Sequence, residues 1–314
     1  MKILALLIAL LIEQARPLRQ GNQAHHAYES FAQYLRQQLD AGQYRQGIVA
    51  WIAAVVPLTL LALIIEWLLA RESALLALAF NAAVLYFTVG FRRFSNYFNK
   101  INHLMKSEDV PAAREQLRQW RNADASELES SDIARVAIEL GLVSSHRSVF
   151  GPLAWFMVVG PAGALMYRLA AVLQEQWLAR HVPVPQSGES TDGGEFTQFA
   201  ARAFEVIDWL PARLTAATFA VVGNFQDAVD CWRTQSPAWA DRAQGIILAS
   251  GAGALGVKLG GAVHEYGRVR YRPELGTGDE ADTDYLSSAV GLIWRALVMW
   301  VLLLAVVTFS RLLG

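Results

Sequence analysis

Cysteine and charge are both scarce in this sequence, and each shortage limits what the protein can be. Cys231 is the single cysteine among 314 residues, so no internal disulfide can form, and no CxxC pair or His/Cys cluster has metal-site spacing. Charged residues make up 18% of the chain, whereas soluble domains contain about 25%. The formal net charge is −1, so the chain has no overall positive charge that would attract a nucleic acid. We therefore expect no disulfide framework, no metal site and no nucleic-acid partner.

Phosphate-binding loops and catalytic triads are also missing. The glycine-rich stretch at 254–263 reads ALGVKLGGAV, which fits neither G-x-x-x-x-G-K-[ST] nor G-x-G-x-x-G. No Ser-His-Asp or Cys-His arrangement can be traced. The motifs therefore identify no catalytic residue.

Long apolar runs are what the chain has instead, and hydrophobic residues make up 54% of it. Residues 47–69 and 73–91 predict a hairpin of two membrane helices, and residues 148–173 and 291–314 predict two further spans. Residues 1–12 predict a short membrane helix, which we favour, or a cleaved signal peptide. We therefore predict an all-α, polytopic integral membrane protein with about four to six membrane helices.

Glycine and proline interrupt these apolar runs. Pro57 predicts a kink in the first long span, and Gly160-Pro161 predicts a helix break or a close helix contact within 148–173. Asn81 is the polar group in the middle of its span, and we expect it to face another helix. Some of the membrane helices should therefore be broken.

The polar segments predict the topology. Residues 92–147 have apolar residues at helical spacing, which indicates two or three amphipathic surface helices, and nine Lys/Arg, which place this loop in the cytoplasm. Residues 174–290 form a second loop with possible broken or re-entrant segments. We predict one membrane domain over 1–314, multi-pass in the bacterial inner membrane, with the lipid bilayer as partner and possible homo-oligomers.

The stretch DWLPARLTA at 208–216 places ionisable residues in an apolar run. Glu205 and Asp208 are three apart and should share a helix face. Pro211 should free the carbonyl four residues earlier and break the helix, with Arg213 just past the break. These groups either line an internal cavity that binds an anionic ligand or face water from an interfacial helix.

Residues 254–284 carry a second set of candidates. The glycines allow a close approach of the backbone, while Lys258 and Arg272 favour a phosphate or a carboxylate. The acidic tail ELGTGDEADTD suits a divalent cation. The alternative is a glycine-rich packing helix followed by a solvated loop.

Three motifs in this order resemble the CobD/CbiB family: ARVAIE followed by GPLAWFMVVGPAGALMYRLAAVL, then DWLPARLTA, then GALGVKLGG with RPELGTG. Those are membrane proteins of cobalamin biosynthesis, adenosylcobinamide-phosphate synthases. The resemblance implies ATP-dependent amide formation between adenosylcobyric acid and aminopropanol or its phosphate. The stretch LLIALLIEQARPLRQGNQAHHAYESF looks instead like AmpE, a related membrane protein linked to β-lactamase induction, and VIDWLPARLTAATFAVVG also resembles AmpE.

Departures from the synthase pattern are concentrated in its acidic and amide positions. Glu139 is kept, while Val143, Ser144, Arg147, Ala171 and Gln174 replace carboxylates or amides that the family carries. Such groups would hold Mg²⁺ and orient the reacting atoms. The remaining candidates for ligand binding are Glu139, Tyr167, Arg168, Glu205, Asp208, Arg213, Lys258 and Arg272.

These departures favour an AmpE-like regulatory or ligand-binding protein with a degenerate synthase site. We expect it to bind an anionic small molecule in an interior cavity that the embedded cations and carboxylates share. The alternative is an active adenosylcobinamide-phosphate synthase, with ATP and Mg²⁺ as cofactors and carboxylates drawn from Glu205, Asp208, Asp279 and Asp282. A third possibility is a scaffold in which the glycines serve helix packing alone.

Overall fold

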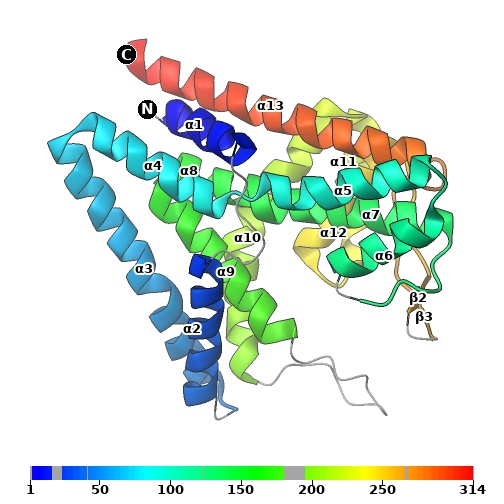
Figure 1. The fold of residues 1–314 in the computed structure, drawn as a ribbon, viewed down its shortest axis with the longest axis horizontal. Coiled ribbons are helices and arrows are strands. Elements are labelled where there is room, and N and C mark those ends of the chain that lie inside the picture. The colour runs from blue at the N-terminus through cyan, green and yellow to red at the C-terminus, as the bar shows by residue number, and fades with distance from the viewer. Residues whose placement is uncertain are drawn as a thin grey trace. The chain divides into compact units, whose positions relative to one another are not determined.

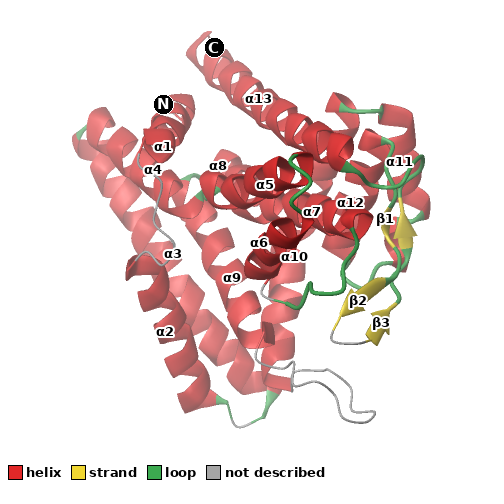
Figure 2. Ribbon diagram, turned by 45° about the vertical axis from the view of Figure 1, so that its right-hand side comes forward, coloured by secondary structure: helices red, strands yellow, loops and turns green. Residues whose placement is uncertain are grey.

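The computed structural model describes residues 2–15, 23–40, 42–121, 123–179, 195–265 and 268–313. Helices dominate the described part of the chain, and four strands of two or three residues are its β-structure (Figure 1, Figure 2). The predicted all-α class is therefore confirmed. The chain divides into two compact units, Met1–Val89 with Gly151–Leu210 and Gly90–Phe150 with Pro211–Gly314.

The first unit is helical. Its elements are α1 (Lys2–Ala15), α2 (Gln23–Leu39), α3 (Tyr44–Glu72), α4 (Ala74–Thr88), α8 (Gly151–Val159), α9 (Pro161–Ala179) and the first part of α10 (Glu195–Val222). The second unit contains α5 (Phe91–Lys106), α6 (Val110–Arg121), α7 (Ser130–Ser145), the π-turn η1 (His146–Phe150), the rest of α10, α11 (Phe225–Thr234), the 3₁₀ turn η2 (Ser236–Ala238), α12 (Arg242–Leu255), β1 (Leu259–Gly260), β2 (Val263–Glu265), β3 (Arg268–Arg270), β4 (Glu274–Leu275) and α13 (Thr283–Leu313).

Helices α3 and α4 form the predicted hairpin. A single residue, Ser73, separates them, and its hydroxyl accepts a hydrogen bond from the Leu75 amide, which caps α4. The buried positions of α3 are small, and its large apolar side chains, such as Leu61 and Ile64, are about half exposed (53% and 51%). An apolar face of this length on the outside of a helix suits contact with lipid.

Within the described residues, two helices are long and apolar enough to cross a membrane, Tyr44–Glu72 and Thr283–Val306. Helix α4 is apolar but shorter, with 15 residues. The predicted span over 148–173 is not one helix, because α8 ends at Val159 and α9 begins at Pro161. Gly160 between them has a φ of +92°, a conformation that favours glycine, and proline suits the first turn of the new helix.

The 92–147 segment contains three helices, α5, α6 and α7, within the predicted range of two or three. The expectation that all are surface helices is wrong for α7, where nine residues are buried. Helix α7 packs against α5, α6, α12 and α13, so it is a central helix of the second unit. Its alanine-rich stretch has little of the polar surface that an exposed helix needs.

Helix α10 continues through Pro211, so the predicted break there is wrong. Pro211 has no N–H and leaves the carbonyl of Ile207 without its helical donor. The indole Nε1 of Trp155 donates to that carbonyl over 3.0 Å. Because another helix supplies the missing donor, the proline is accommodated inside a continuous helix.

A substitution of this donor tests the compensation. Trp155→Phe keeps an aromatic ring but leaves the Ile207 carbonyl unpaired, which should lower the free energy of unfolding by about 1–3 kcal/mol. Pro211→Ala restores a backbone N–H, so the same Trp155→Phe change should cost less in that background. Thermal or denaturant unfolding in detergent measures both effects.

Trp51 provides the matched control. Its indole nitrogen is buried and has no hydrogen-bond partner, so Trp51→Phe removes the same ring atoms without breaking a hydrogen bond and should cost less than Trp155→Phe. Equal losses for Trp155→Phe and Trp51→Phe, or a loss that Pro211→Ala leaves unchanged, would contradict the role assigned to the indole.

Candidate functional site

Glu139 lies on the buried side of α7 and is the centre of a polar network in the second unit. Its side chain is 8% exposed and forms an ion pair with Arg272. The Arg272 Nη1 donates to Oε2 over 2.6 Å, and Nη2 donates to Oε1 over 3.0 Å. The backbone amide of Gly260 donates to Oε1 over 2.8 Å. Both carboxylate oxygens are therefore occupied, in the two-pronged geometry that makes an arginine–carboxylate pair strong.

Arg272 also closes the turn that follows α12. Its Nη2 donates to the carbonyl of Gly260 and its Nε to that of Gly261, at 3.2 and 3.4 Å. Gly260 has a φ of +77°, and a Cβ there would overlap the carbonyl of Pro273. The short strands β1 and β4 pair across this point, with Gly260 opposite Glu274. The glycines therefore allow the close backbone approach that their density predicted.

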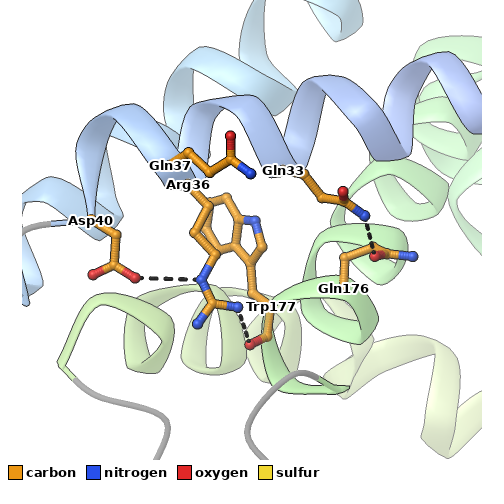
Figure 3. A pocket seen from close by; sticks show the side chains of 6 residues that line it. All are labelled: Gln33, Arg36, Gln37, Asp40, Gln176 and Trp177. Carbon is orange, nitrogen blue, oxygen red and sulfur yellow. Dashed lines mark hydrogen bonds and ion pairs between the residues drawn. The ribbon is translucent and has the colours of Figure 1, made fainter.

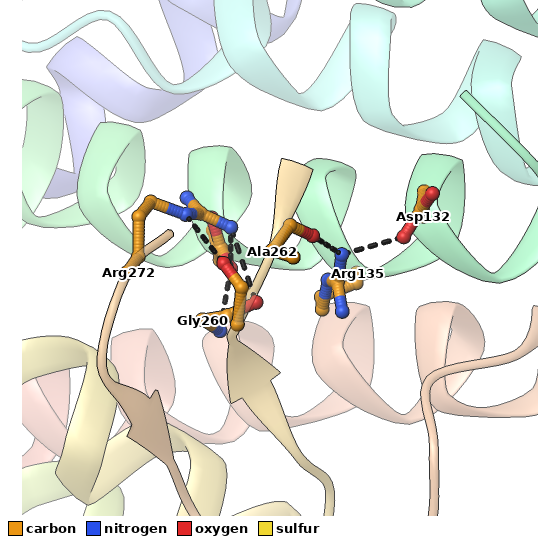
Figure 4. A network of polar contacts seen from close by, with 7 residues as sticks. Asp132, Arg135, Gly260, Ala262 and Arg272 are labelled. Carbon is orange, nitrogen blue, oxygen red and sulfur yellow. Dashed lines mark hydrogen bonds and ion pairs between the residues drawn. The ribbon is translucent and has the colours of Figure 1, made fainter. Parts of the chain in front are cut away.

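A cavity of about 250 Å³ lies beside this network. It is lined by Ser131, Asp132, Arg135, Lys258, Leu259, Gly260, Gly261, Glu274, Glu280 and Ala281. Figure 4 shows Arg272 at Gly260 and Arg135 between Asp132 and the Ala262 carbonyl, above the strands. Helix α7 supplies one wall and the turn after α12 the other.

The charges of this cavity are mixed. Lys258 and Arg135 are positive, and Asp132, Glu274 and Glu280 are negative. The Nε of Arg135 is buried and has no hydrogen-bond partner, while its Nη2 is bonded to Asp132 and to the Ala262 carbonyl. The cavity is suited to a ligand that presents an anionic group to these two cations and a hydrogen-bond donor to the carboxylates at the rim.

The structure brings three of the predicted site residues together here: Glu139, Lys258 and Arg272. Lys258 is exposed, which corrects the expectation that it is embedded. It follows Gly256, whose left-handed conformation ends α12, and its backbone amide donates to the Asp279 carbonyl, so it lies in a turn outside the helix. Arg213 is not among the residues that line this cavity.

Two of the predicted site residues, Tyr167 and Asp208, contact each other in the first unit. Tyr167 is fully buried, and its hydroxyl donates to the Asp208 carboxylate over 2.9 Å. Asp208 is 2% exposed. Gly151 makes room for the ring, because a Cβ there would overlap it. This bond explains one of the polar residues in DWLPARLTA, since the carboxylate connects α10 to α9.

Glu205, Arg168 and Arg213 lie in different surroundings. Glu205 is exposed, so the expectation that it shares an environment with Asp208 is wrong. Residues three apart are separated by about 60° around a helix, and the edge of the buried face of α10 falls between these two. Arg168 on α9 is half-buried. Arg213 is half-buried in the second unit, where burial and then the like charge of Arg242 lower its pKa.

Sequence reasoning included Glu139 but missed Ser131, Asp132 and Arg135, which α7 contributes to the lining of the cavity. Ser131, Arg135 and Glu139 follow one another at a spacing of four residues and therefore share a helix face. That period was present in SSDIARVAIE. His146, just beyond α7, is fully buried, and its Nδ1 lies 2.9 Å from the Thr215 hydroxyl oxygen.

A second cavity, of about 310 Å³, lies in the first unit between α2 and α9. Its lining is polar and consists of Gln33, Arg36, Gln37, Asp40, Gln176 and Trp177. Figure 3 shows Arg36 between Asp40 and the carbonyl of Trp177, and Gln33 against Gln176. None of the predicted site residues lines it.

Comparison with known proteins identifies the family. The sequence model described as CobD/Cbib protein matches residues 3–293 of this chain. The chain belongs to the CobD/CbiB family. The matched region includes Glu139, Arg272 and the cavity beside them.

Curated relatives within the CobD/CbiB family cover most of the chain. The Cobalamin biosynthesis protein CobD of Stutzerimonas stutzeri is 35% identical over 263 residues, 84% of this chain and 82% of that protein. The protein of the same name from Chromobacterium violaceum is 34% identical over 255 residues, 81% of this chain and 77% of its own. One from Mycobacterium tuberculosis is 27% identical over 201 residues. No solved structure matches this chain.

The residues at the positions that depart from the family pattern have the following surroundings in the structure. Arg147 forms an ion pair with Asp241 over 3.5 Å. Ala171 is buried, and the Oε1 of Gln174 is buried without a hydrogen-bond partner. The described residues contain no group of three His, Cys, Asp or Glu that is close enough to hold a metal ion. In the cavity of the second unit, Asp132 forms an ion pair with Arg135, so its carboxylate is not part of a preformed set of metal ligands there.

Removal of one partner of the buried pair tests its structural role. Glu139→Gln keeps the shape but leaves Arg272 without its counter-charge, which should lower the free energy of unfolding by about 3–5 kcal/mol. Glu115→Gln is the matched control, because Glu115 and Arg118 form an ion pair on the exposed surface of α6. Such exposed pairs contribute little. Similar unfolding midpoints for both variants would show that the buried pair does not hold the turn.

Proposed function

We propose that this protein acts in cobalamin biosynthesis, in the step that joins an amine to a corrinoid carboxyl group with ATP. The AmpE-like role that the sequence favoured becomes the second candidate. The support is the family match over residues 3–293 and the two relatives at 35% and 34% identity that carry the name Cobalamin biosynthesis protein CobD. In this reaction the amine nitrogen replaces a carboxyl oxygen, which leaves with the transferred phosphoryl group.

The cavity of the second unit is the proposed binding site for an anionic part of the substrates. Lys258 at the rim supplies a positive hydrogen-bond donor to a phosphate or a carboxylate, and the guanidinium of Arg135 adds positive charge to the lining. Glu280 and Glu274 are placed to accept from a donor on the same ligand. This mixed lining is the observation that supports a binding site here.

Glu139 acts in this proposal as a positioning residue. Its two oxygens accept hydrogen bonds from Arg272 and from the Gly260 amide, so neither is left to take a proton from a substrate amine. Its role is to fix the turn that carries Lys258 and Gly261. The retention of Glu139 in a chain that lost other family carboxylates fits a structural requirement better than a catalytic one.

We further propose that the protein is embedded in the inner membrane of a bacterium. Helices α3 and α13 are long and apolar enough to cross, and the large apolar side chains of α3 face outward. The CobD/CbiB family match agrees with this location. Additional passes through α4 and the broken α8–α9 pair would give the multi-pass topology that the sequence predicts.

The second candidate is the AmpE-like role, in which the protein binds an anionic ligand without amide synthesis and affects β-lactamase induction. One observation favours it: Val143, Arg147, Ala171 and Gln174 stand where the synthase pattern has carboxylates or amides. A synthase with these changes has to draw acidic groups from elsewhere, and the described residues form no metal-binding cluster.

Complementation decides between the two candidates. In a bacterial strain that lacks its own synthase and needs cobalamin made from a corrinoid precursor, we expect this chain to restore growth. If the expressed chain is present in the membrane but growth is not restored, while induction returns in a strain that lacks AmpE, the second candidate is correct.

Two lysine substitutions, one in the cavity and one outside it, test the cavity in the same assay. Lys258→Met removes the cation at the rim and should lower the rate of growth at limiting precursor about tenfold, the effect expected of one charge-assisted hydrogen bond. Lys106→Met is the control, because Lys106 is exposed at the end of α5 and does not line the cavity. Equal growth of the two variants would remove Lys258 from the site.

A further inference from the structure

A polar cluster of the first unit lies outside both cavities, where α8 gives way to α9. It contains Lys2 of α1, Glu66 of α3 and Asn81 of α4. Helices α1 and α4 lie side by side, and α3 joins α4 at Ser73 (Figure 1). The cluster is surrounded by apolar segments, where ionisable groups are costly and usually serve a function.

The helix break supplies backbone acceptors to this cluster. The carbonyl of Met157 would accept from the residue four positions later, which is Pro161 and has no N–H. The ammonium of Lys2 donates to this carbonyl over 3.0 Å and to that of Phe156 over 3.3 Å. The Phe156 carbonyl also accepts from the Gly160 amide over 3.0 Å. Carbonyls at a helix C-terminus carry partial negative charge, which adds to the attraction for a cation.

Two side chains add oxygen atoms to the same place. The Glu66 carboxylate lies against the break, since a Cβ at Gly160 would be 3.2 Å from each of its oxygens. Lys2 interacts electrostatically with Glu66, and the Asn81 amide donates to that carboxylate. Asn81 is 7% exposed, and its Oδ1 is buried with no hydrogen-bond partner. One acceptor of the cluster is therefore unused.

We propose that Glu66, Asn81 and the carbonyls of Phe156 and Met157 form a binding site for a small monovalent cation of the ammonium type, and that Lys2 is its built-in occupant. Carbonyl, amide and carboxylate oxygens at the C-terminal end of a broken helix are the ligands that membrane proteins use for monovalent cations. The ammonium of Lys2 stands in for such a cation. The site does not depend on the cobalamin proposal, because none of its residues lines the cavity of the second unit.

The occupant determines what the site does. While Lys2 is bound, α1 is held to the end of α8 and an external cation is excluded. When the lysine is absent, the carboxylate and the carbonyls lose its three N–H donors. A primary alkylammonium ion of similar size then supplies the same three N–H donors.

Chemical rescue tests this proposal. Lys2→Ala should lower the thermal unfolding midpoint in detergent, and n-propylammonium chloride should raise it again in a saturable manner. Tetramethylammonium chloride at the same ionic strength is the control cation, because it has the charge but no N–H donor, and it should have no such effect. The wild-type protein, whose site is filled, should not respond to either salt beyond the general effect of ionic strength.

Further variants assign the response to the cluster. In the Lys2→Ala background, Glu66→Gln should abolish the rescue, and Pro161→Ala should weaken it because Met157 regains a backbone donor. Lys2→Met, which keeps the stem and vacates only the ammonium position, is the second variant if Lys2→Ala cannot be isolated without propylammonium, and ammonium chloride is then the rescuing salt. Equal responses of wild type and Lys2 variant to the rescuing salt, or equal responses to that salt and to tetramethylammonium, would overturn the proposal.

Discussion

Backbone carbonyls that prolines leave without a donor are the constraint on which this structure depends. Inside apolar helices an unpaired carbonyl is costly, and water is not there to pair with it. Pro161 frees the carbonyl of Met157, and Lys2 supplies a donor from α1. Pro211 frees that of Ile207, and Trp155 supplies a donor from α8. In both cases a side chain from another helix completes the bonding, so each proline fixes a helix–helix contact.

The second unit satisfies its buried polar groups in a related way. Glu139 would be costly in the interior of α7, but Arg272 and the amide of Gly260 occupy both of its oxygens. The turn after α12 is thereby held against α7, and the cavity beside it gains Lys258 and the guanidinium of Arg135. A structural ion pair thus positions the groups that we propose for ligand binding. Its loss should affect stability and binding together.

Much of the fold and part of the site could be predicted from the sequence. The apolar runs gave the α3–α4 hairpin and α13, and Gly160-Pro161 gave the break. The association of Glu139 with Arg272 could not be derived, because 133 residues separate them and hydrophobic periodicity carries no information on such contacts. The continuity of α10 through Pro211 was missed for the same reason, since it depends on a donor from a distant segment. The shared face of Ser131, Arg135 and Glu139 could have been predicted, because their spacing of four residues matches the period of a helix.

An experimental structure in lipid nanodiscs, at a resolution that resolves side chains, tests the central claim most directly. The account predicts that the indole nitrogen of Trp155 lies within hydrogen-bond distance of the Ile207 carbonyl and the Lys2 ammonium within that of Met157. The contradictory result is a structure in which Lys2 extends to the lipid headgroups and the Trp155 indole points away from α10, with both carbonyls unpaired.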